Sequence, residues 1–340
     1  MKNTFVRRVL PIGLAIALLW YVLKDVPLTE LAAQFRRADY RWLVLVGVMV
    51  MLYHLTRAVR WQLTLQALGY RPSLVRTTVA LLAGTMTSMI VPGAGELTRC
   101  GTIQRTDGVP MAQGIGSVVA ERVIDLLLLV GLIGLTLLLE FSRVGQYIGN
   151  LLAPFRARIA SVVESGWVTS AVLVGVLMMA GLLYWLAQQR AVRQHRFVIR
   201  LVGIGRDVGR GFAGIRKLRQ PVLFVALAVL TEVLLFLMTY VLFFAAPQTS
   251  GLPPSAALTI LTVSSLGGLV VPTQGGLGTY HFLVSRVLML YGLNETDSIL
   301  VATFLHAVQV GFSLLLSSLS FLFVPVLIRQ WSQQAEKAVE

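Results

Sequence analysis

The chain has 340 residues, of which 56% are hydrophobic and only 13% are charged. Soluble globular domains carry about 25% charged residues, so this composition excludes an ordinary soluble domain and indicates a protein that lies in a lipid bilayer. The formal net charge of +14 favours contact with anionic lipid headgroups, and we expect no nucleic-acid partner for a chain that is otherwise buried in lipid.

Apolar runs long enough to form membrane helices follow one another along most of the chain. The first run, 11–23, follows a basic start, and because no A-x-A cleavage site comes after it we expect an uncleaved span and not a removed signal peptide. The later runs lie at 42–68, 74–91, 114–139, 167–187, 221–246, 255–271 and 298–328, with a weaker run at 277–291. The polar stretch 190–220 holds nine Lys and Arg and a single acid.

Two segments interrupt these runs with proline, glycine and polar residues: VPGAGELTR at 91–99 and VPTQGGLGTYH at 271–281. Each begins with Val-Pro, and the two starts are 180 residues apart. Non-helical backbone persists inside a bilayer only where protein or an aqueous cavity satisfies its N–H and C=O groups. A matched pair of breaks in the two halves of a membrane chain therefore predicts a transport site.

The positive-inside rule decides between two topologies. If every main run crossed the membrane fully, the basic stretch 190–220 would lie outside; it lies inside if the run 74–91 enters the membrane and returns. The same treatment of the second break leaves both termini in the cytoplasm. We therefore predict an all-α polytopic membrane protein, an inverted repeat with about six full transmembrane helices and two opposed re-entrant helical hairpins.

This topology gives a single integral membrane domain, 1–340, made of two halves. The first half, 1–165, contains a re-entrant hairpin at 74–108. The predicted second half is 166–340, with a cytoplasmic basic loop at 190–220 and a re-entrant hairpin at 255–291. The distribution of charge supports the repeat, whereas few residues are identical between the halves.

Three ionisable residues lie deep in the run 114–139, namely Glu121, Arg122 and Asp125. A helical rise of 1.5 Å per residue places them roughly 10–16 Å into a hydrocarbon core of about 30 Å, where charge is costly unless it is paired or faces a polar cavity. They are three or four residues apart, so they can share one helix flank. Either they bind a ligand, or Arg122 and Asp125 form an ion pair that joins two helices; Glu121 then faces Arg99 or a headgroup.

Further charged candidates lie at the first break and at the end of the second span. Glu96 and Arg99 are three residues apart, and a short helix that starts near them would favour an anion at its N-terminus. Arg57, Arg60 and Trp61 can hold a lipid phosphate at the inner surface or anchor the span at the interface. For Arg57 and Trp61 we favour the interfacial anchor.

Lone ionisable residues elsewhere in the spans rank second, because such residues are more often interhelical contacts than proton carriers. They are His54, Glu232, His281 and His306. At the second break, Gly275, Gly276 and Gly278 permit close approach to a ligand, a sharp turn, or close packing of helices.

The segments VPGAGELTR, VVAERVIDLL and VPTQGGLGTYH follow the order and spacing of the motifs P-x-x-G-E-x-x-R, E-R-x-x-D and P-x-P-G-G-L-G-x-x-E, and residues 57–61 add R-x-x-R-W. Over nearly its whole length the sequence resembles the flippase-like membrane family that includes the membrane half of lysylphosphatidylglycerol synthase, the multiple peptide resistance factor. The resemblance implies a protein of the bacterial cytoplasmic (inner) membrane that carries lipids with modified headgroups, or polyprenyl-linked sugars, between leaflets. The matching positions are Pro92, Gly95, Glu96, Arg99, Glu121, Arg122, Asp125, Pro272, Gly275, Gly276 and Gly278.

Two positions depart from these motifs. Gln274 stands where the family has a second proline, and His281 stands where it has an acid. Without that acid the second break cannot neutralise a cationic headgroup in the family's way, so aminoacylated lipid is not a secure expectation for the substrate. The sequence stops at Glu340 without a soluble aminoacyl-transfer domain, so we expect that the chain does not make such a lipid itself.

We expect a lipid flippase or transporter that moves a polar or charged headgroup through a central polar cavity, with no enzymatic step and no cofactor or metal. The sequence has no G-x-x-x-x-G-K-[ST] loop, so movement is downhill or ion-coupled. The alternatives are a lipid-modifying transferase, whose usual D-x-D and H-x-x-x-x-D motifs do not occur in the sequence, and a non-catalytic membrane partner of a lipid synthase or glycosyltransferase. The residues expected to contact the lipid are Arg60, Glu96, Arg99, Glu121, Arg122, Asp125, Thr273, Gln274, Gly275, Gly276, Tyr280, His281 and His306.

Overall fold

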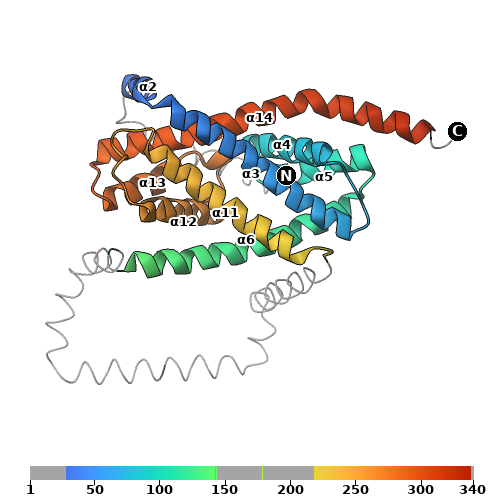
Figure 1. Cartoon of the computed structure of the whole chain (residues 1–340), viewed down its shortest axis with the longest axis horizontal. Helices are drawn as coiled ribbons and strands as arrows, with labels where there is room; N and C mark the ends of the chain where they lie inside the picture. Colours follow the sequence, from blue (N-terminus) through green and yellow to red (C-terminus); the bar gives the residue numbers. More distant parts are fainter. Residues whose placement is uncertain (1–27, 142, 144–177, 179–217, 338–340) are drawn as a thin grey trace. The chain divides into compact units, whose positions relative to one another are not determined.

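The apolar runs fold into helices, and all regular secondary structure among the described residues is helical. The computed structural model describes residues 28–141, 143, 178 and 218–337 (Figure 1). The predicted span at 11–23, the predicted span at 167–187 apart from residue 178, and the basic loop 190–220 apart from its last three residues lie outside these residues. The described helices are α2 (Leu28–Arg37), α3 (Tyr40–Ala67), α4 (Leu74–Ile90), α5 (Ala94–Asp107), α6 (Met111–Leu139), α11 (Pro221–Phe243), α12 (Pro254–Val270), the 3₁₀ turn η1 (Gln274–Gly276), α13 (Thr279–Leu290) and α14 (Glu295–Lys337).

The chain divides into two units, one formed by Met1–Thr136 with Gly214–Glu340 and the other by Leu137–Ala213. Apart from the last residues of α6, every described helix belongs to the first unit. The second unit contains few described residues; in it, Arg143 Nη1 lies 2.9 Å from Glu140 Oε2.

Four described helices are long and apolar enough to cross a membrane: α3, α6, α11 and the Glu295–Ser320 part of α14. They coincide with four of the predicted crossings. In contrast, α4 and α12 are apolar helices of only 17 residues each, shorter than the ~20 residues that span a hydrocarbon core. The prediction of an all-α, multi-pass membrane protein is confirmed.

Local sequence explains where these helices begin and end. The Asp39 carboxylate accepts a hydrogen bond from the Arg41 backbone N–H at 2.9 Å and so caps the start of α3. α4 ends at Ile90, shortly before Pro92, because a residue that precedes proline avoids the helical region. Gly93 then has φ of +80°, a conformation that side chains with a Cβ rarely adopt, and it starts α5.

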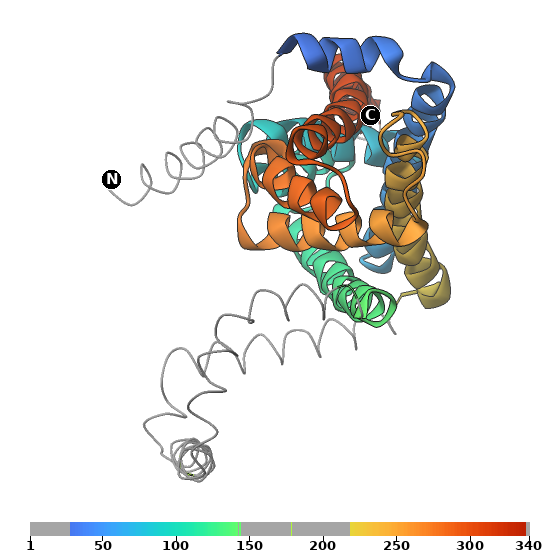
Figure 2. The ribbon, with the colours of Figure 1, turned by 90° about the vertical axis from the view of Figure 1, so that its left-hand side faces the viewer.

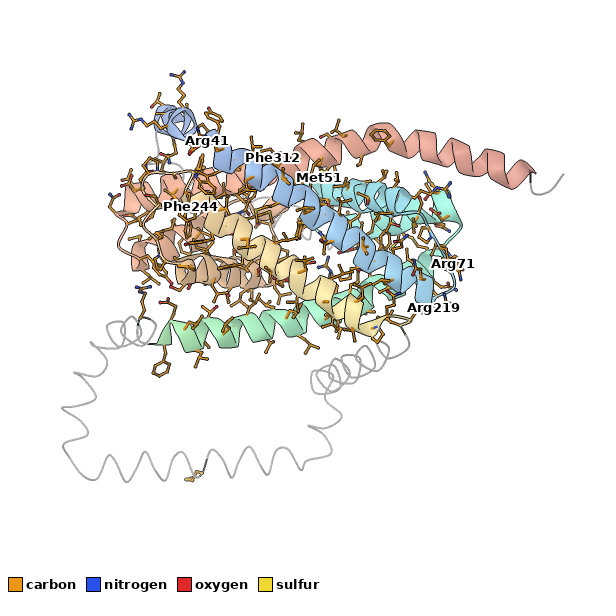
Figure 3. All side chains as sticks on the ribbon, in the orientation of Figure 1. Arg41, Met51, Arg71, Arg219, Phe244 and Phe312 are labelled. Carbon is orange, nitrogen blue, oxygen red and sulfur yellow. The ribbon has the colours of Figure 1, made fainter. Side chains whose placement is uncertain are left out.

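α3 and α11 lie side by side and run in opposite directions. At one end the rings of Trp42 and Phe244 are 5.2 Å apart. Figure 3 shows Arg41 and Phe244 at this end and Arg71 and Arg219 at the other. The basic residues that follow α3 and precede α11 therefore share one end of the helix pair.

α2 packs across α14, where the rings of Phe35 and Phe304 are 5.0 Å apart (Figure 2). α14 also packs against α3. There, Phe312 lies so close to Gly47 that a Cβ at that glycine would be 2.7 Å from the Phe312 ring. The largest apolar cluster of the described residues forms among α3, α11, α12, α13 and α14.

Each Val-Pro break joins two helices that pack against each other, α4 with α5 and α12 with α13. In the first pair, a Cβ at Gly84 would be 2.6 Å from the Gly95 carbonyl oxygen. In the second pair, a Cβ at Gly267 would collide with Leu283 and would be 3.3 Å from Thr279 Cγ2. A glycine on the first helix thus permits close packing in both pairs.

Candidate functional site

Three arginines and three carboxylates from α3, α5 and α6 form a closed network of alternating charge, which we call the ion ring. Each arginine contacts two acids and each acid contacts two arginines. Its members are Arg60, Asp125, Arg122, Glu96, Arg99 and Glu121. Charges that would be costly one by one in a membrane are thereby paired on both sides.

The side chains on one side of the ion ring are buried. Glu121 Oε2 accepts a hydrogen bond from Arg99 Nη2 at 2.9 Å, and Glu121 Oε1 lies 3.7 Å from Arg60 Nε. Each of these three side chains is at most 4% exposed. Of the two partners considered for Glu121, Arg99 or a headgroup, the structure shows Arg99, and Arg60 is its second protein partner.

The other side of the ion ring is open. Asp125 lies 2.7 Å from Arg60 Nη1 and 3.4 Å from Arg122 Nη1. Glu96 lies 2.6 Å from Arg99 Nε and also pairs with Arg122. The side chains of Glu96 and Arg122 are 32% and 52% exposed, so a ligand can reach this side. The Arg122–Asp125 pair exists, but it is one link of a larger network.

Trp61 packs against the buried side of the ion ring through Arg99. The guanidinium carbon of Arg99 lies 4.8 Å from the centre of the Trp61 ring, within the range of a cation–π contact. The indole N–H donates to Ser117 Oγ at 2.9 Å, and Trp61 is fully buried. The expectation of an interfacial anchor is therefore wrong for Trp61, since neighbouring helices enclose the end of α3 on this face.

Three cavities adjoin one another, and two of them border the ion ring. The large cavity, about 760 Å³, is lined by the open side of the ion ring and also by Arg57, Gly93, Glu232 and Pro272. The small cavity, about 160 Å³, lies between α4 and α5 and shares Arg57, Glu96 and Arg122 with the large one. Because Gly93 and Pro272 line the same space, both Val-Pro breaks reach it.

Arg57 and Glu232 line the large cavity without belonging to the ion ring. Arg57 Nη1 lies 3.5 Å from the Tyr53 hydroxyl, and its guanidinium lies 5.5 Å from the Tyr53 ring. No carboxylate among the described residues comes within salt-bridge distance of Arg57. Since the ring itself is neutral overall, Arg57 is the arginine outside the ring among the described residues that line the large cavity, which makes it the candidate to bind an anion there.

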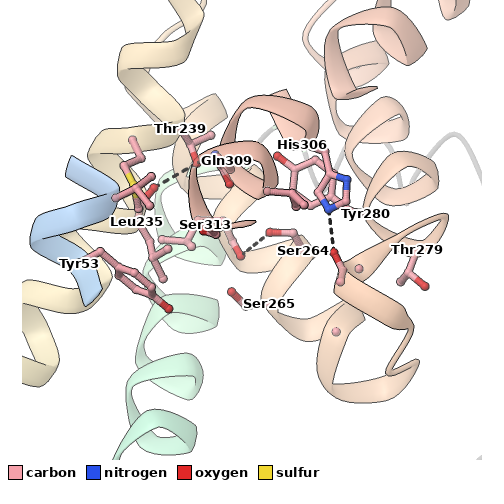
Figure 4. Close-up of a pocket in the computed structure, with 17 residues that line it drawn as sticks. Tyr53, Leu235, Thr239, Ser264, Ser265, Thr279, Tyr280, His306, Gln309 and Ser313 are labelled. Carbon is pink, nitrogen blue, oxygen red and sulfur yellow. Dashed lines mark hydrogen bonds between the residues drawn. The ribbon is translucent and has the colours of Figure 1, made fainter. Parts of the chain in front are cut away.

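The third cavity, about 430 Å³, lies beside the second break and is shown in Figure 4. We call it the hydroxyl cavity, because Ser264, Ser265, Tyr280 and Ser313 line it together with Gln309. It shares Tyr53, Leu235, Ser265 and Gly268 with the large cavity, so the two adjoin.

His306 joins the second break to α14 at this cavity. Its Nε2 lies 2.9 Å from the Gly275 carbonyl oxygen, and because a carbonyl only accepts, Nε2 is the protonated nitrogen. The Tyr280 ring stacks on the His306 ring at 4.7 Å, with 23° between the planes. Four predicted site residues line the hydroxyl cavity, namely Gly275, Gly276, Tyr280 and His306. No member of the ion ring lines it.

Two other candidates from the second break do not line these three cavities. His281 is buried and its Nδ1 accepts the Gly278 backbone N–H at 3.2 Å, which caps α13. Thr273 is also buried, and its hydroxyl donates to Thr279 Oγ1 at 3.3 Å. The side chain of Gln274 lies outside the described residues.

Several residues that line the cavities were not among the predicted site residues. Tyr53 is four residues before Arg57, while Gln309 and Ser313 follow His306 at three and seven residues. This spacing puts each set on one helix face. Polar residues that repeat at three or four positions beside a charged or titratable residue were the available signal.

A family model described as "Lysylphosphatidylglycerol synthase TM region" matches residues 8–317 of the chain. The resemblance inferred from the motifs is thereby confirmed. No curated protein and no solved structure matches the chain.

Proposed function

Because the chain belongs to the family of the lysylphosphatidylglycerol synthase transmembrane region, we propose that it is a lipid flippase or transporter. It moves a lipid with a polar or charged headgroup between leaflets, while the acyl or prenyl tails stay in the bilayer. The headgroup travels through the large cavity, and the chain carries out no chemical step on it.

The adjoining polar cavities within a bundle of apolar helices are the observation that carries this proposal. A charged headgroup loses its hydration when it enters hydrocarbon, and this loss is the main barrier to unaided movement. The open side of the ion ring offers both signs of charge to replace that hydration. Arg57 offers the unpaired cation that a lipid phosphate requires.

The arrangement of the short helices supports the topology proposed for this function. α4 begins beside Arg71 and Arg76, whereas α12 begins at the end of the bundle to which α11 runs. We propose that the two pairs are opposed re-entrant hairpins in an inverted repeat, with the basic end and both termini in the cytoplasm of a bacterium. A lipid released from one leaflet could then meet both Val-Pro breaks at the membrane centre.

Purified protein in lipid vesicles provides the test. We expect the vesicles to move fluorescent-tailed phosphatidylglycerol between leaflets faster than vesicles without protein. Arg57→Gln should slow this movement about tenfold or more, since a hydrogen bond to a charged partner contributes about 1.5–3 kcal/mol. Arg71→Gln is the matched control, because Arg71 is exposed and lies outside the cavities.

The outcome separates the competing functions. Movement by the wild type and by Arg71→Gln, with loss in a folded Arg57→Gln protein, supports transport. If the wild type moves no lipid faster than empty vesicles do, the transport proposal fails. If mass spectrometry instead finds a covalently altered lipid after incubation with a donor lipid, the transferase alternative is correct.

A further inference from the structure

The hydroxyl cavity differs in chemistry from the large cavity that adjoins it. Among its lining residues there is no Asp, Glu, Lys or Arg. Its polar groups are hydroxyls, the Gln309 amide and the His306 imidazole. A charged group has no partner there, whereas a neutral group that both donates and accepts hydrogen bonds has several.

The Tyr280 hydroxyl belongs to a residue that lines the hydroxyl cavity, and its oxygen is buried and lacks a hydrogen-bond partner within the described residues. A buried hydroxyl without a partner is destabilising, so it calls for a bound group or an ordered water. The ring of Tyr280 is held in place by its stacking on His306, so the hydroxyl has a fixed direction.

Tyr53 connects the two cavities. Its hydroxyl contacts Arg57 Nη1 at 3.5 Å, and the residue lines both the large cavity and the hydroxyl cavity. Tyr53 and Arg57 are one helical turn apart, or about 6 Å along α3. A substituent esterified to a phosphate at Arg57 therefore starts beside the hydroxyl cavity.

We infer that the two cavities bind one headgroup in two parts, a phosphate at Arg57 and a neutral, hydroxyl-rich substituent such as glycerol or a sugar in the hydroxyl cavity. This inference rests on the proposed function and names the class of lipid that it would move. The volume of about 430 Å³ is within the usual range of small-ligand sites, about 300–1,000 Å³.

The same geometry disfavours a cationic substituent. Two of the acids that line the large cavity, Glu96 and Asp125, are already paired in the ion ring. Glu232 is the remaining acid in that cavity, and it does not line the hydroxyl cavity. An amine on the substituent would have to leave the hydroxyl cavity to reach Glu232.

Binding of short-chain lipids to the purified full chain in detergent tests the inference. The probes are dioctanoyl phosphatidylglycerol, with a diol on its phosphate, dioctanoyl phosphatidic acid, with the phosphate alone, and dioctanoyl phosphatidylethanolamine, with an amine. We expect phosphatidylglycerol to bind about 3- to 10-fold more tightly than either other lipid, as one or two neutral hydrogen bonds would provide.

Tyr280→Phe removes only the hydroxyl oxygen, so it should abolish the preference for phosphatidylglycerol over phosphatidic acid. Ser313→Ala should reduce the same preference and gives a second, independent variant. Tyr240→Phe is the matched control, because Tyr240 lies in an aromatic cluster with Phe236 and Phe244 outside the cavities. It should keep the wild-type preference.

Two results would overturn the inference. One is equal binding of phosphatidylglycerol and phosphatidic acid by the wild type. The other is tightest binding of phosphatidylethanolamine, with the preference lost in Glu232→Gln. If the diol preference is found but vesicles show no lipid movement, the transport proposal fails while the headgroup assignment stands.

Discussion

Glu121 shows how single charges are tolerated at this depth. It is 3% exposed and lies between the guanidiniums of Arg60 and Arg99. Each of those arginines contacts a second acid on the open side of the ion ring, Asp125 and Glu96 respectively. Removal of one buried charge leaves its partners uncompensated in a medium that solvates them poorly, so the network is stable only as a whole.

Glu121→Gln is therefore expected to lower the free energy of unfolding by about 3–5 kcal/mol, the cost of breaking a buried ion pair. Thermal unfolding in detergent, followed by circular dichroism, measures the effect. Glu295→Gln is the matched control: Glu295 pairs with Arg286 at 3.5 Å, but both side chains are largely exposed. An exposed pair contributes about 0–1 kcal/mol, so equal destabilisation by both substitutions would contradict this account.

At the scale of helices, glycines let the two helices that flank each break pack closely against each other. In the first pair the Gly95 Cα faces the backbone of Gly84, and a Cβ at Gly95 would collide with the Gly84 carbonyl oxygen and with Ser88 Oγ. The helices approach each other this closely because neither glycine has a side chain. The position of Glu96 and Arg99 in the ion ring depends on this approach, since both follow Gly95 on α5.

Gly95→Ala should therefore separate α4 from α5 and weaken lipid movement along with stability, by about 1–3 kcal/mol as for overpacking in a core. Gly101→Ala is the control on the same helix, because nothing lies within 4 Å of a Cβ built there. It should be neutral or stabilising, since alanine is favoured over glycine in a helix by about 1 kcal/mol. Thermal unfolding of both variants and of the wild type in detergent measures these differences in stability.

The sequence could predict elements better than contacts. The ends of α4 and α12 follow from Val-Pro. The depth of Glu121 in the membrane indicates that it needs a partner, but the sequence leaves Arg99 and a lipid headgroup as alternatives. Arg60 could not be paired in advance, because Glu121 lies 61 residues further along the chain and only the packing of α3 on α6 joins them. The sequence around Trp61 does not distinguish a side chain that faces lipid from one that faces protein, because its burial depends on the neighbouring helices.

At the scale of the whole chain, the proposed opposed orientation of the two helix pairs rests on where the basic residues lie. Arg71 and Arg219 are at one end of the α3–α11 pair (Figure 3), and positive residues stay in the cytoplasm. In the proposed topology, α13 runs outward from the membrane centre. The loop that precedes α14 therefore lies at the outer end of α13. We therefore expect Arg71 and Thr296, both exposed, to face opposite sides of the membrane.

Single cysteines at these positions test the orientation. The native Cys100 is buried and is replaced by alanine first. A membrane-impermeant maleimide added to intact cells should then label Thr296→Cys and should leave Arg71→Cys unmodified until the inner membrane is made permeable. Labelling of both cysteines from the same side would contradict opposed hairpins, because an inverted pair requires α4 and α12 to enter from different faces.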